Sequence, residues 1–174
     1  DFTKNDDQII GNDSSEDISG GMGNDDIDGG KGSDEIDGGL GNDDLDGGKG
    51  TDSLDGGLGN DVLDGGKGDD ILNGGEGDDL LIGGRGADTY LLSLGNDTIR
   101  GFKGDDEIEL SQELIDAGLS RSDVTIKTTT IDGKEAAILS YSLAGQDYTT
   151  TVIGVKDAEE IIIQKTSISS NNVK

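Results

Sequence analysis

A nine-residue repeat runs without interruption from Gly20 to Leu91. Its eight copies read GGMGNDDID, GGKGSDEID, GGLGNDDLD, GGKGTDSLD, GGLGNDVLD, GGKGDDILN, GGEGDDLLI and GGRGADTYL. They share the pattern G-G-x-G-x-D-x-U-x, in which U is an apolar residue. Because each unit has one apolar position, it can bury that side chain only against its neighbours, so the chain must stack one small structural unit many times.

The repeat register continues beyond these copies in both directions. Two further nines, LSLGNDTIR and GFKGDDEIE, keep the aspartate of position six and the apolar residue of position eight. Upstream, Glu16 and Ile18, then Asp7 and Ile9, occupy the same positions among few glycines, so residues 1–19 are predicted to be degenerate coils. Position six downstream is Asp25, Asp34, Asp43, Asp52, Asp61, Asp70, Asp79, Asp88, Asp97 and Asp106.

A second period of eighteen residues lies inside the first. Position three alternates between apolar and basic residues, and position five alternates between Asn and Ser or Thr. One coil therefore contains two nines, with odd copies stacked on one edge and even copies on the other. The apolar row is Met22, Leu40 and Leu58, and the basic row is Lys31, Lys49, Lys67, Arg85 and Lys103.

These two rows are predicted to lie on opposite edges. The apolar row is interpreted as packing between turns. The basic row is interpreted as solvated charge that offsets neighbouring carboxylates, since single surface charges stabilise little. The alternative is a track for an anionic polysaccharide. Neighbouring residues in the basic row should be about 4.8 Å apart.

The residue types suit a parallel roll that binds a hard cation. In the short strand around position eight, one side chain points inward and its neighbours point outward. The glycines of positions one, two and four allow positive φ, which can turn backbone carbonyls toward one point. Such cations take about six to eight oxygen ligands at roughly 2.3–2.6 Å. The chain has no His and no Cys, so the ligands typical of zinc and copper sites are missing.

Charge opposes folding of the metal-free repeats. Residues 20–109 carry 24 Asp and Glu against 6 Lys and Arg, and the whole chain has a net charge of −26. One apolar side chain per nine residues offsets little of the backbone entropy, which is largest for glycine. Without a cation we therefore expect a disordered, self-repelling chain.

The repeat resembles the RTX (repeats-in-toxin) family of haemolysin-type calcium-binding nonapeptides. The resemblance implies an all-β fold, a right-handed parallel β-roll with two nonapeptides per coil. It also implies that each Ca²⁺ lies between two stacked turns of one edge. One turn contributes its Asp and the carbonyls of positions two and four, and the next contributes its Asp and the carbonyls of positions one and three.

Carried onto this sequence, the family pattern gives three gaps between complete turns on each edge, hence six calcium ions, and up to eight if the turns of Asp97 and Asp106 contribute. The ligands implied on the first edge are Gly21, Gly23, Asp25, Gly38, Gly39, Leu40, Gly41, Asp43, Gly56, Gly57, Leu58, Gly59, Asp61, Gly74, Gly75, Glu76, Gly77 and Asp79. Those on the second are Gly30, Gly32, Asp34, Gly47, Gly48, Lys49, Gly50, Asp52, Gly65, Gly66, Lys67, Gly68, Asp70, Gly83, Gly84, Arg85, Gly86 and Asp88.

Residues 110–174 have fewer glycines and more β-branched residues, and they are predicted to form an antiparallel β region that caps the exposed end of the roll. Ser111 is expected to cap a short helix over 112–117 that Gly118 ends. Ile131-Asp132-Gly133 is expected to be the turn of a hairpin. The predicted strands are 124–130, 135–142, 147–155 and 160–165.

Five apolar residues occupy outward positions in the later copies. They are expected to be covered by the C-terminal region or by the N-terminal coils, because water should not face so many apolar groups on a small roll. The alternative is a docking face for a partner. The residues are Val62, Ile71, Leu80, Ile82 and Leu91.

Composition excludes several function classes. Without His, neither a Ser-His-Asp triad nor an H-E-x-x-H zinc site can form, and a filled roll offers no evident pocket for a carboxylate pair. The negative charge disfavours nucleic acid, and no apolar run reaches the roughly 18 residues of a membrane span. The EF-hand calcium motif does not fit the repeats. A non-catalytic module, monomeric and not transmembrane, is therefore expected.

The exit from the repeats adds to the resemblance. ADTYLL at residues 87–92 and DTIRGFKGDDEIELS at residues 97–111 are similar to the end of the roll in serralysin-type proteases and alginate-epimerase modules. This implies a secreted bacterial protein, extracellular or at the cell surface, that leaves through type I secretion machinery and folds in external calcium. Residues 158–174 are the candidate secretion signal.

The chain begins at Asp1 without a basic-apolar leader, so we expect a piece of a longer protein. The activity of the parent is open: it could be an enzyme or a toxin. The alternatives to a folding module are a carbohydrate-binding module of a polysaccharide-modifying enzyme and a segment of a surface adhesin or toxin.

Overall fold

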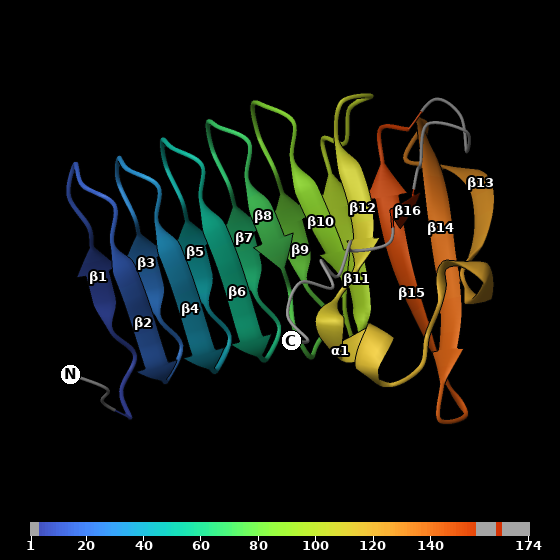
Figure 1. Ribbon diagram of the computed structural model, residues 1–174, viewed down its shortest axis with the longest axis horizontal. Helices are drawn as coiled ribbons and strands as arrows, with labels where there is room; N and C mark the ends of the chain where they lie inside the picture. The colour runs from blue at the N-terminus through green and yellow to red at the C-terminus, as the bar shows by residue number, and fades with distance from the viewer. Residues whose placement is uncertain (1–3, 156–162, 165–174) are drawn as a thin grey trace, which may run out of the picture.

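Two β-sheets face one another along the length of the molecule (Figure 1). The computed structural model describes residues 4–155 and 163–164. The first sheet has the order β1 (Gln8–Ile10), β3 (Asp26–Asp28), β5 (Asp44–Asp46), β7 (Val62–Asp64), β9 (Leu80–Ile82), β11 (Asn96–Arg100), β15 (Gln146–Ile153), β14 (Lys134–Leu143) and β13 (Thr125–Ile131). The second has the order β16 (Ile163–Gln164), β12 (Glu107–Leu110), β10 (Thr89–Leu92), β8 (Ile71–Asn73), β6 (Ser53–Leu58), β4 (Glu35–Leu40) and β2 (Asp17–Met22).

The strands of the roll are parallel and pair with a constant offset of eighteen residues. In the first sheet Ile27 pairs with Leu45, and in the second Ile36 pairs with Leu54. The chain therefore alternates between the two sheets with every nonapeptide, and one coil contains one strand of each. This confirms the predicted parallel β-roll with two nonapeptides per coil.

The core is a double row of position-eight side chains between the two sheets. Each of them has 0–1% of its surface exposed, and fully burying such a side chain is worth about 1.5–3 kcal/mol. Each inward residue meets the equivalents one coil before and one coil after it. The row consists of Ile27, Ile36, Leu45, Leu54, Leu63, Leu72, Leu81, Tyr90, Ile99 and Ile108.

The C-terminal elements begin where the repeats end. The predicted short helix is present as α1 (Gln112–Asp116), and the Ser111 side chain accepts a hydrogen bond from the Leu114 N–H. A 3-10 turn, η1 (Arg121–Asp123), then leads into the predicted hairpin of β13 and β14. Asp132 and Gly133 join these strands with φ of 51° and 77°, as a two-residue hairpin turn requires.

The hairpin joins the roll through β15. This strand pairs antiparallel with β14 and parallel with β11, where Ile99 lies opposite Val152. Strands β13 to β15 therefore lengthen the first sheet at its C-terminal end (Figure 1). In the predicted strand over 160–165, Ile163 and Gln164 form β16 beside β12, and the remaining residues lie outside the described part of the chain.

The outward apolar residues are only partly covered. Val62 is 36% exposed and Ile71 is 43% exposed, so the expectation that they are covered is wrong for these two. The reason is that β15 extends the first sheet beside β11 and β16 extends the second beside β12, so these strands lengthen the sheets and do not cover the outer faces of β7 and β8. Leu80, Ile82 and Leu91 are half-buried.

The apolar row of position three also reaches solvent. Met22, Leu40 and Leu58 pair in register along one edge of the second sheet, and they remain 42–45% exposed. Part of each side chain faces its neighbours along the row, and the rest faces solvent.

Candidate metal centre

The turns are stacked so closely that some positions admit only glycine. The position-four glycines have positive φ, for example 154° at Gly50. A methyl group built on Gly50 would lie 1.3 Å from the Gly32 carbonyl oxygen of the preceding coil. On the other edge a methyl group on Gly41 would lie 1.5 Å from the Gly23 oxygen. The sequence requirement at position four thus comes from backbone contact as well as from φ.

The position-six aspartates form a ladder along each edge. The Asp25 N–H donates to Asp43 Oδ1 at 2.7 Å, and the Asp43 N–H donates to Asp61 Oδ1 at 2.8 Å. On the other edge the Asp34 N–H donates to Asp52 Oδ1 at 2.9 Å, and the series continues in the same way. One carboxylate oxygen of each aspartate is therefore fixed by the backbone of the preceding coil.

The second carboxylate oxygen is buried and unsatisfied in eight of these aspartates. Their Oδ2 atoms have no hydrogen-bond partner among the residues that the structure describes, and the residues are 1–3% exposed. A buried charged group without a partner is strongly unfavourable, so a cation at these oxygens would stabilise the fold. The eight are Asp25, Asp34, Asp43, Asp52, Asp61, Asp70, Asp79 and Asp88.

Each of six turns brings an unsatisfied Oδ2 together with a carbonyl oxygen of the next coil. A methyl group built on Gly38 would lie 2.6 Å from Asp43 Oδ2 and 2.8 Å from the Gly56 oxygen. Across the six turns these distances are 2.4–2.9 Å to Oδ2 and 2.6–3.1 Å to the carbonyl. Two oxygens that converge without a proton between them suit a hard cation. The position-one glycines are Gly20, Gly29, Gly38, Gly47, Gly56 and Gly65.

The other predicted carbonyl ligands are engaged in the backbone ladder. The Gly30 oxygen accepts the Lys49 N–H at 3.0 Å, and the Lys49 oxygen accepts the Gly32 N–H at 2.9 Å. On the other edge the Leu40 oxygen accepts the Gly23 N–H at 2.9 Å. A carbonyl oxygen has two lone pairs, so the one left over is available to a metal. The structure thus brings the aspartate and position-one carbonyl oxygens together. That the carbonyls of positions two and three also bind the ion stays a prediction.

The last two aspartates of the series differ from the other eight. Asp97 Oδ2 accepts a hydrogen bond from the Ser93 hydroxyl at 3.3 Å. Asp106 Oδ2 accepts the Lys103 N–H at 2.8 Å. Protein groups therefore occupy the oxygens that would otherwise face a cation.

Burial raises the pKa of the site carboxyls. Desolvation is the largest cause, and neighbouring aspartates add to it, so the pKa of Asp61 rises to about 6 and that of Asp70 to about 7. Since the folded-state pKa exceeds the ordinary value of 3.8, the folded chain binds these protons more tightly than the unfolded chain. The metal-free fold is therefore predicted to lose stability as the pH rises from about 4 to 7. Burial likewise raises the pKa of Asp43, Asp52, Asp79, Asp88, Asp97 and Asp106.

Hydrogen bonds that involve no predicted metal ligand also join successive turns at position five, where the side chain accepts a backbone N–H of the next coil. The Asn42 N–H donates to Asn24 Oδ1 and the Asn60 N–H donates to Asn42 Oδ1, each at 2.8 Å. On the second edge the Thr51 N–H donates to Ser33 Oγ at 3.3 Å. Sequence reasoning noted the alternation at this position but missed its role. The signal was the short oxygen-bearing side chain in every complete copy before Ala87.

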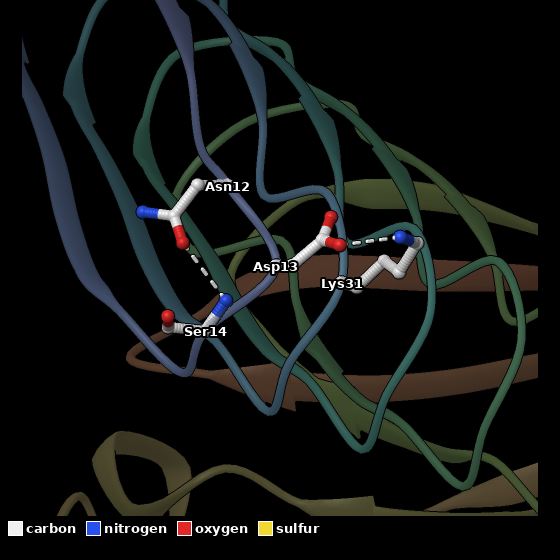
Figure 2. A network of polar contacts seen from close by, with 4 residues as sticks. All are labelled: Asn12, Asp13, Ser14 and Lys31. Carbon is white, nitrogen blue, oxygen red and sulfur yellow. Dashed lines mark hydrogen bonds and ion pairs between the residues drawn. The ribbon is translucent and has the colours of Figure 1, made fainter.

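The basic row is in register and exposed. Lys31, Lys49, Lys67 and Arg85 pair in succession along one edge, as predicted. Lys31 Nζ lies 2.6 Å from Asp13 Oδ2, in the preceding turn, where Asn12 Oδ1 accepts the Ser14 N–H (Figure 2). Lys103 Nζ donates instead to the Gly84 carbonyl.

The oxygen-only donor set fits a hard divalent cation better than a transition metal. Among residues 4–155 and 163–164, no group of three or more His, Cys, Asp or Glu side chains is arranged to hold a metal ion. A cation at these turns would therefore need backbone carbonyls in addition to the carboxylates. Calcium accepts such mixed carbonyl and carboxylate ligands readily.

Comparison with known proteins identifies the repeats. A family model described as the RTX calcium-binding nonapeptide repeat matches more than half of the chain, in four copies at residues 3–27, 19–54, 55–90 and 92–112. A search of curated protein sequences finds no significant match.

Solved structures that match the chain include two subunits of an epimerase and a lipase. The solution structure of the AlgE6R3 subunit of the Azotobacter vinelandii mannuronan C5-epimerase is 21% identical with a TM-score of 0.41, over 90% of this chain and 78% of that one. The AlgE6R2 subunit of the same enzyme is 20% identical with a TM-score of 0.32, over 91% and 93%. The extracellular lipase LipA of Serratia marcescens is 19% identical with a TM-score of 0.34; the match covers 90% of this chain and 40% of the lipase.

Proposed function

Because the chain belongs to the RTX calcium-binding nonapeptide repeat family, whose repeats bind calcium, we propose that it folds around calcium ions held between successive turns of each edge. The observation that carries this proposal is the set of eight buried, unsatisfied Oδ2 atoms. Six of them converge with a carbonyl oxygen of the next coil, so six ions, three per edge, are proposed.

The proposed ligands of each ion come from two turns. In the gap between the turns of Asp43 and Asp61, Asp43 Oδ2 and the Gly56 carbonyl already lie together. The Asp61 carboxylate reaches the same gap, because its Oδ1 accepts the Asp43 N–H. The carbonyls of Gly39, Gly41 and Leu58 would complete the set. The ion supplies positive charge that balances the buried carboxylates.

Calorimetric titration of the chelator-treated protein tests this proposal. We expect at least six calcium ions per chain, and we expect Asp61→Asn to weaken the two ions on either side of Asp61, since its two oxygens face different gaps. Asp132→Asn is the matched control, because it removes a carboxylate from an exposed hairpin turn. No calcium uptake, or the same isotherm for Asp61→Asn and wild type, would refute the proposal.

We further propose that the protein is a secreted bacterial module that folds after export. A ligand that binds only the native state stabilises it by mass action, and extracellular calcium modules work at about 10⁻⁴–10⁻³ M. The chain would thus stay unfolded at low intracellular calcium, pass through type I secretion machinery and fold outside. Residues 158–174 are the proposed secretion signal. In the described part of the chain no helix is long and apolar enough to cross a membrane.

The module is proposed to have three parts with separate roles. Residues 1–19 continue the roll as degenerate coils, and residues 20–109 bind calcium. Residues 110–174 cap the roll, a role supported by the pairing of β15 with β11. The RTX repeats are a non-catalytic unit, so any enzymatic or toxic activity would belong to other parts of a longer protein.

A second candidate function is binding of an anionic polysaccharide along the basic row. The supporting observation is the unbroken, in-register series Lys31, Lys49, Lys67 and Arg85 on an exposed edge. Such a row would meet regularly spaced carboxylates of a polymer such as alginate, and surface charges mainly set encounter and salt dependence.

Charge reversal in the basic row tests this candidate. Lys49→Glu with Lys67→Glu is expected to abolish retardation of the calcium-loaded protein in alginate-containing gels, since both changes place a negative charge against the polymer. Lys127→Glu, on an exposed position of β13, is the control and should leave retardation close to wild type. Equal retardation of the double variant and the control would exclude the basic row as the binding track.

A further inference from the structure

The last complete turn of the second edge is closed by a side chain. In earlier turns of this edge the position-one N–H donates to a carbonyl of the next coil: Gly47 to Asp64 at 2.9 Å. The same bond joins Gly65 to Ile82 at 2.9 Å. The Gly83 N–H instead donates to the Tyr90 hydroxyl oxygen at 2.9 Å. The Tyr90 hydroxyl thus replaces the backbone carbonyl of the next coil that accepts this hydrogen bond in earlier turns.

The same hydroxyl also lies where the next coil would present its position-one carbonyl. A methyl group on Gly65 would lie 2.6 Å from Asp70 Oδ2 and 2.9 Å from the Gly83 oxygen. A methyl group on Gly83 would lie 2.3 Å from Asp88 Oδ2 and 2.6 Å from Tyr90 Oη. The pairing of a carboxylate oxygen with a second oxygen is therefore preserved, and only the source of the second oxygen changes.

The chain course explains why a side chain is needed here. Gly101, which begins the next nonapeptide, has φ of 78°, and no atom of the described chain lies within 4 Å of a methyl group built on it. The backbone has therefore left the stack of turns at Gly101, before it returns to the sheet in β12. Tyr90 is the one position-eight residue with a hydroxyl, where the other copies have Ile or Leu. Its ring is fully buried, with its centroid 6.0 Å from that of Phe102.

We propose that the Tyr90 hydroxyl completes a seventh calcium site, in the turn from Gly83 to Asp88, by replacing the position-one carbonyl that the displaced turn at Gly101 does not supply. This inference rests on the proposed calcium binding. Asp88 is 1% exposed, and its Oδ2 has no hydrogen-bond partner within the described residues. The Lys103 ammonium donates to the Gly84 carbonyl of the same turn and forms no hydrogen bond with this oxygen, so the buried acceptor is left for a metal ion. Tyr90 Oη uses one lone pair for the Gly83 N–H and has another for the ion.

The first edge ends without such a replacement. There a methyl group built on Gly74 would lie 2.2 Å from Asp79 Oδ2, and its three nearest atoms all belong to Asp79, so no second oxygen is paired with that carboxylate. The Oδ2 atoms of Asp97 and Asp106 both accept hydrogen bonds from protein groups, so the aspartate of the following turn is occupied on both edges, and only the second oxygen beside the position-one glycine distinguishes them. The structure therefore assigns the additional site to the second edge alone, and Asp97 and Asp106 should contribute no further ion.

Terbium, which occupies calcium sites and is excited through nearby tyrosines, gives a direct test. Tyr90→Phe is expected to bind one ion fewer per chain than wild type and to lose most of the tyrosine-sensitised terbium emission. Tyr141→Phe is the matched control, because it also removes a buried hydroxyl, one that donates to the Ser93 carbonyl. It should keep both the emission and the stoichiometry.

A second pair of variants separates loss of the site from a general weakening of the fold. Asp88→Asn should weaken two ions, since Asp88 Oδ1 accepts the Asp70 N–H in the preceding gap and Asp88 Oδ2 faces the proposed seventh site. Asp88→Asn combined with Tyr90→Phe should lose no more ions than Asp88→Asn alone, since Tyr90 affects only a site that Asp88→Asn has already removed. If the double variant loses one ion more than Asp88→Asn alone, or if Tyr90→Phe binds as many as wild type, the assignment of Tyr90 is wrong. If wild type itself binds no calcium, the proposed function fails as well.

Discussion

In excess chelator at neutral pH the protein is expected to lose its β-structure, and millimolar calcium is expected to restore it in one cooperative transition. Residues 20–109 contain 24 acidic and 6 basic residues, and eight buried carboxylate oxygens in this region have no partner among the described residues. Each ion present at 100 times its dissociation constant adds about 2.7 kcal/mol. Far-UV circular dichroism during a calcium titration measures the transition.

Magnesium at the same concentrations is the control for the calcium titration. It demands near-octahedral geometry at short distances and gives up its water reluctantly, so turns built of carbonyls and shared carboxylates should respond to it weakly. Full β-structure in excess chelator would show that the roll is stable without metal, and the proposed folding outside the cell would then have to be abandoned.

Acid should partly replace calcium in the same experiment. The pKa of Asp61 is raised to about 6 and those of Asp70 and Asp97 to about 7, so at about pH 4.5 these carboxyls are neutral in the folded state. Chelated protein should therefore gain β-structure when the pH falls from 7 to about 4.5, although acid weakens calcium binding. A metal-free spectrum that does not change over this range would contradict the buried position of these groups.

Gly50→Ala is expected to be the most damaging single substitution in the roll. The new methyl group would lie 1.3 Å from the Gly32 oxygen, and the backbone would have to keep a φ of 154°. Adjacent coils would be forced apart on the second edge, between turns that hold proposed calcium ligands. We expect a loss of more than about 3 kcal/mol of unfolding free energy, measured by urea denaturation in saturating calcium.

The control for Gly50→Ala is Gly104→Ala. No described atom lies within 4 Å of a methyl group at Gly104, and its φ is not in the left-handed region. Its unfolding midpoint should stay close to that of wild type, because Ala restricts the unfolded chain more than Gly. Similar midpoints for the two variants would mean that the coils can separate at position four without cost.

The repetitive half of the molecule was predictable because its pattern is local. The apolar residue of position eight, as in Ile27 and Leu45, recurs with the period of the stack, so fold and register follow from spacing alone. The aspartate of position six was likewise predictable as a buried oxygen donor. The short helix and the Asp132-Gly133 turn have their own local signals, and both are present.

Non-local pairing could not be predicted in this way. Nothing in the residues of β15 specifies that Val152 will lie beside Ile99, because the pairing depends on which sheet edge is free. The expectation that Val62 and Ile71 are covered was wrong for the same reason, because the sequence does not specify that β15 and β16 extend the ends of the two sheets. Tyr90 was read as one more core residue, since its hydroxyl acquires a role only where the chain leaves the stack.

The constant offset of eighteen residues has a consequence for how such a gene can change length. A tandem duplication of residues 56–73 would add one coil, about 4.8 Å of rod, and would leave every donor facing its former type of acceptor. A duplication of only residues 56–64 would move everything downstream to the opposite edge, so that Lys67 would follow Leu58 and β15 would meet the other sheet. Viable length variants should therefore differ by whole coils, and growth by half a coil should be eliminated by selection.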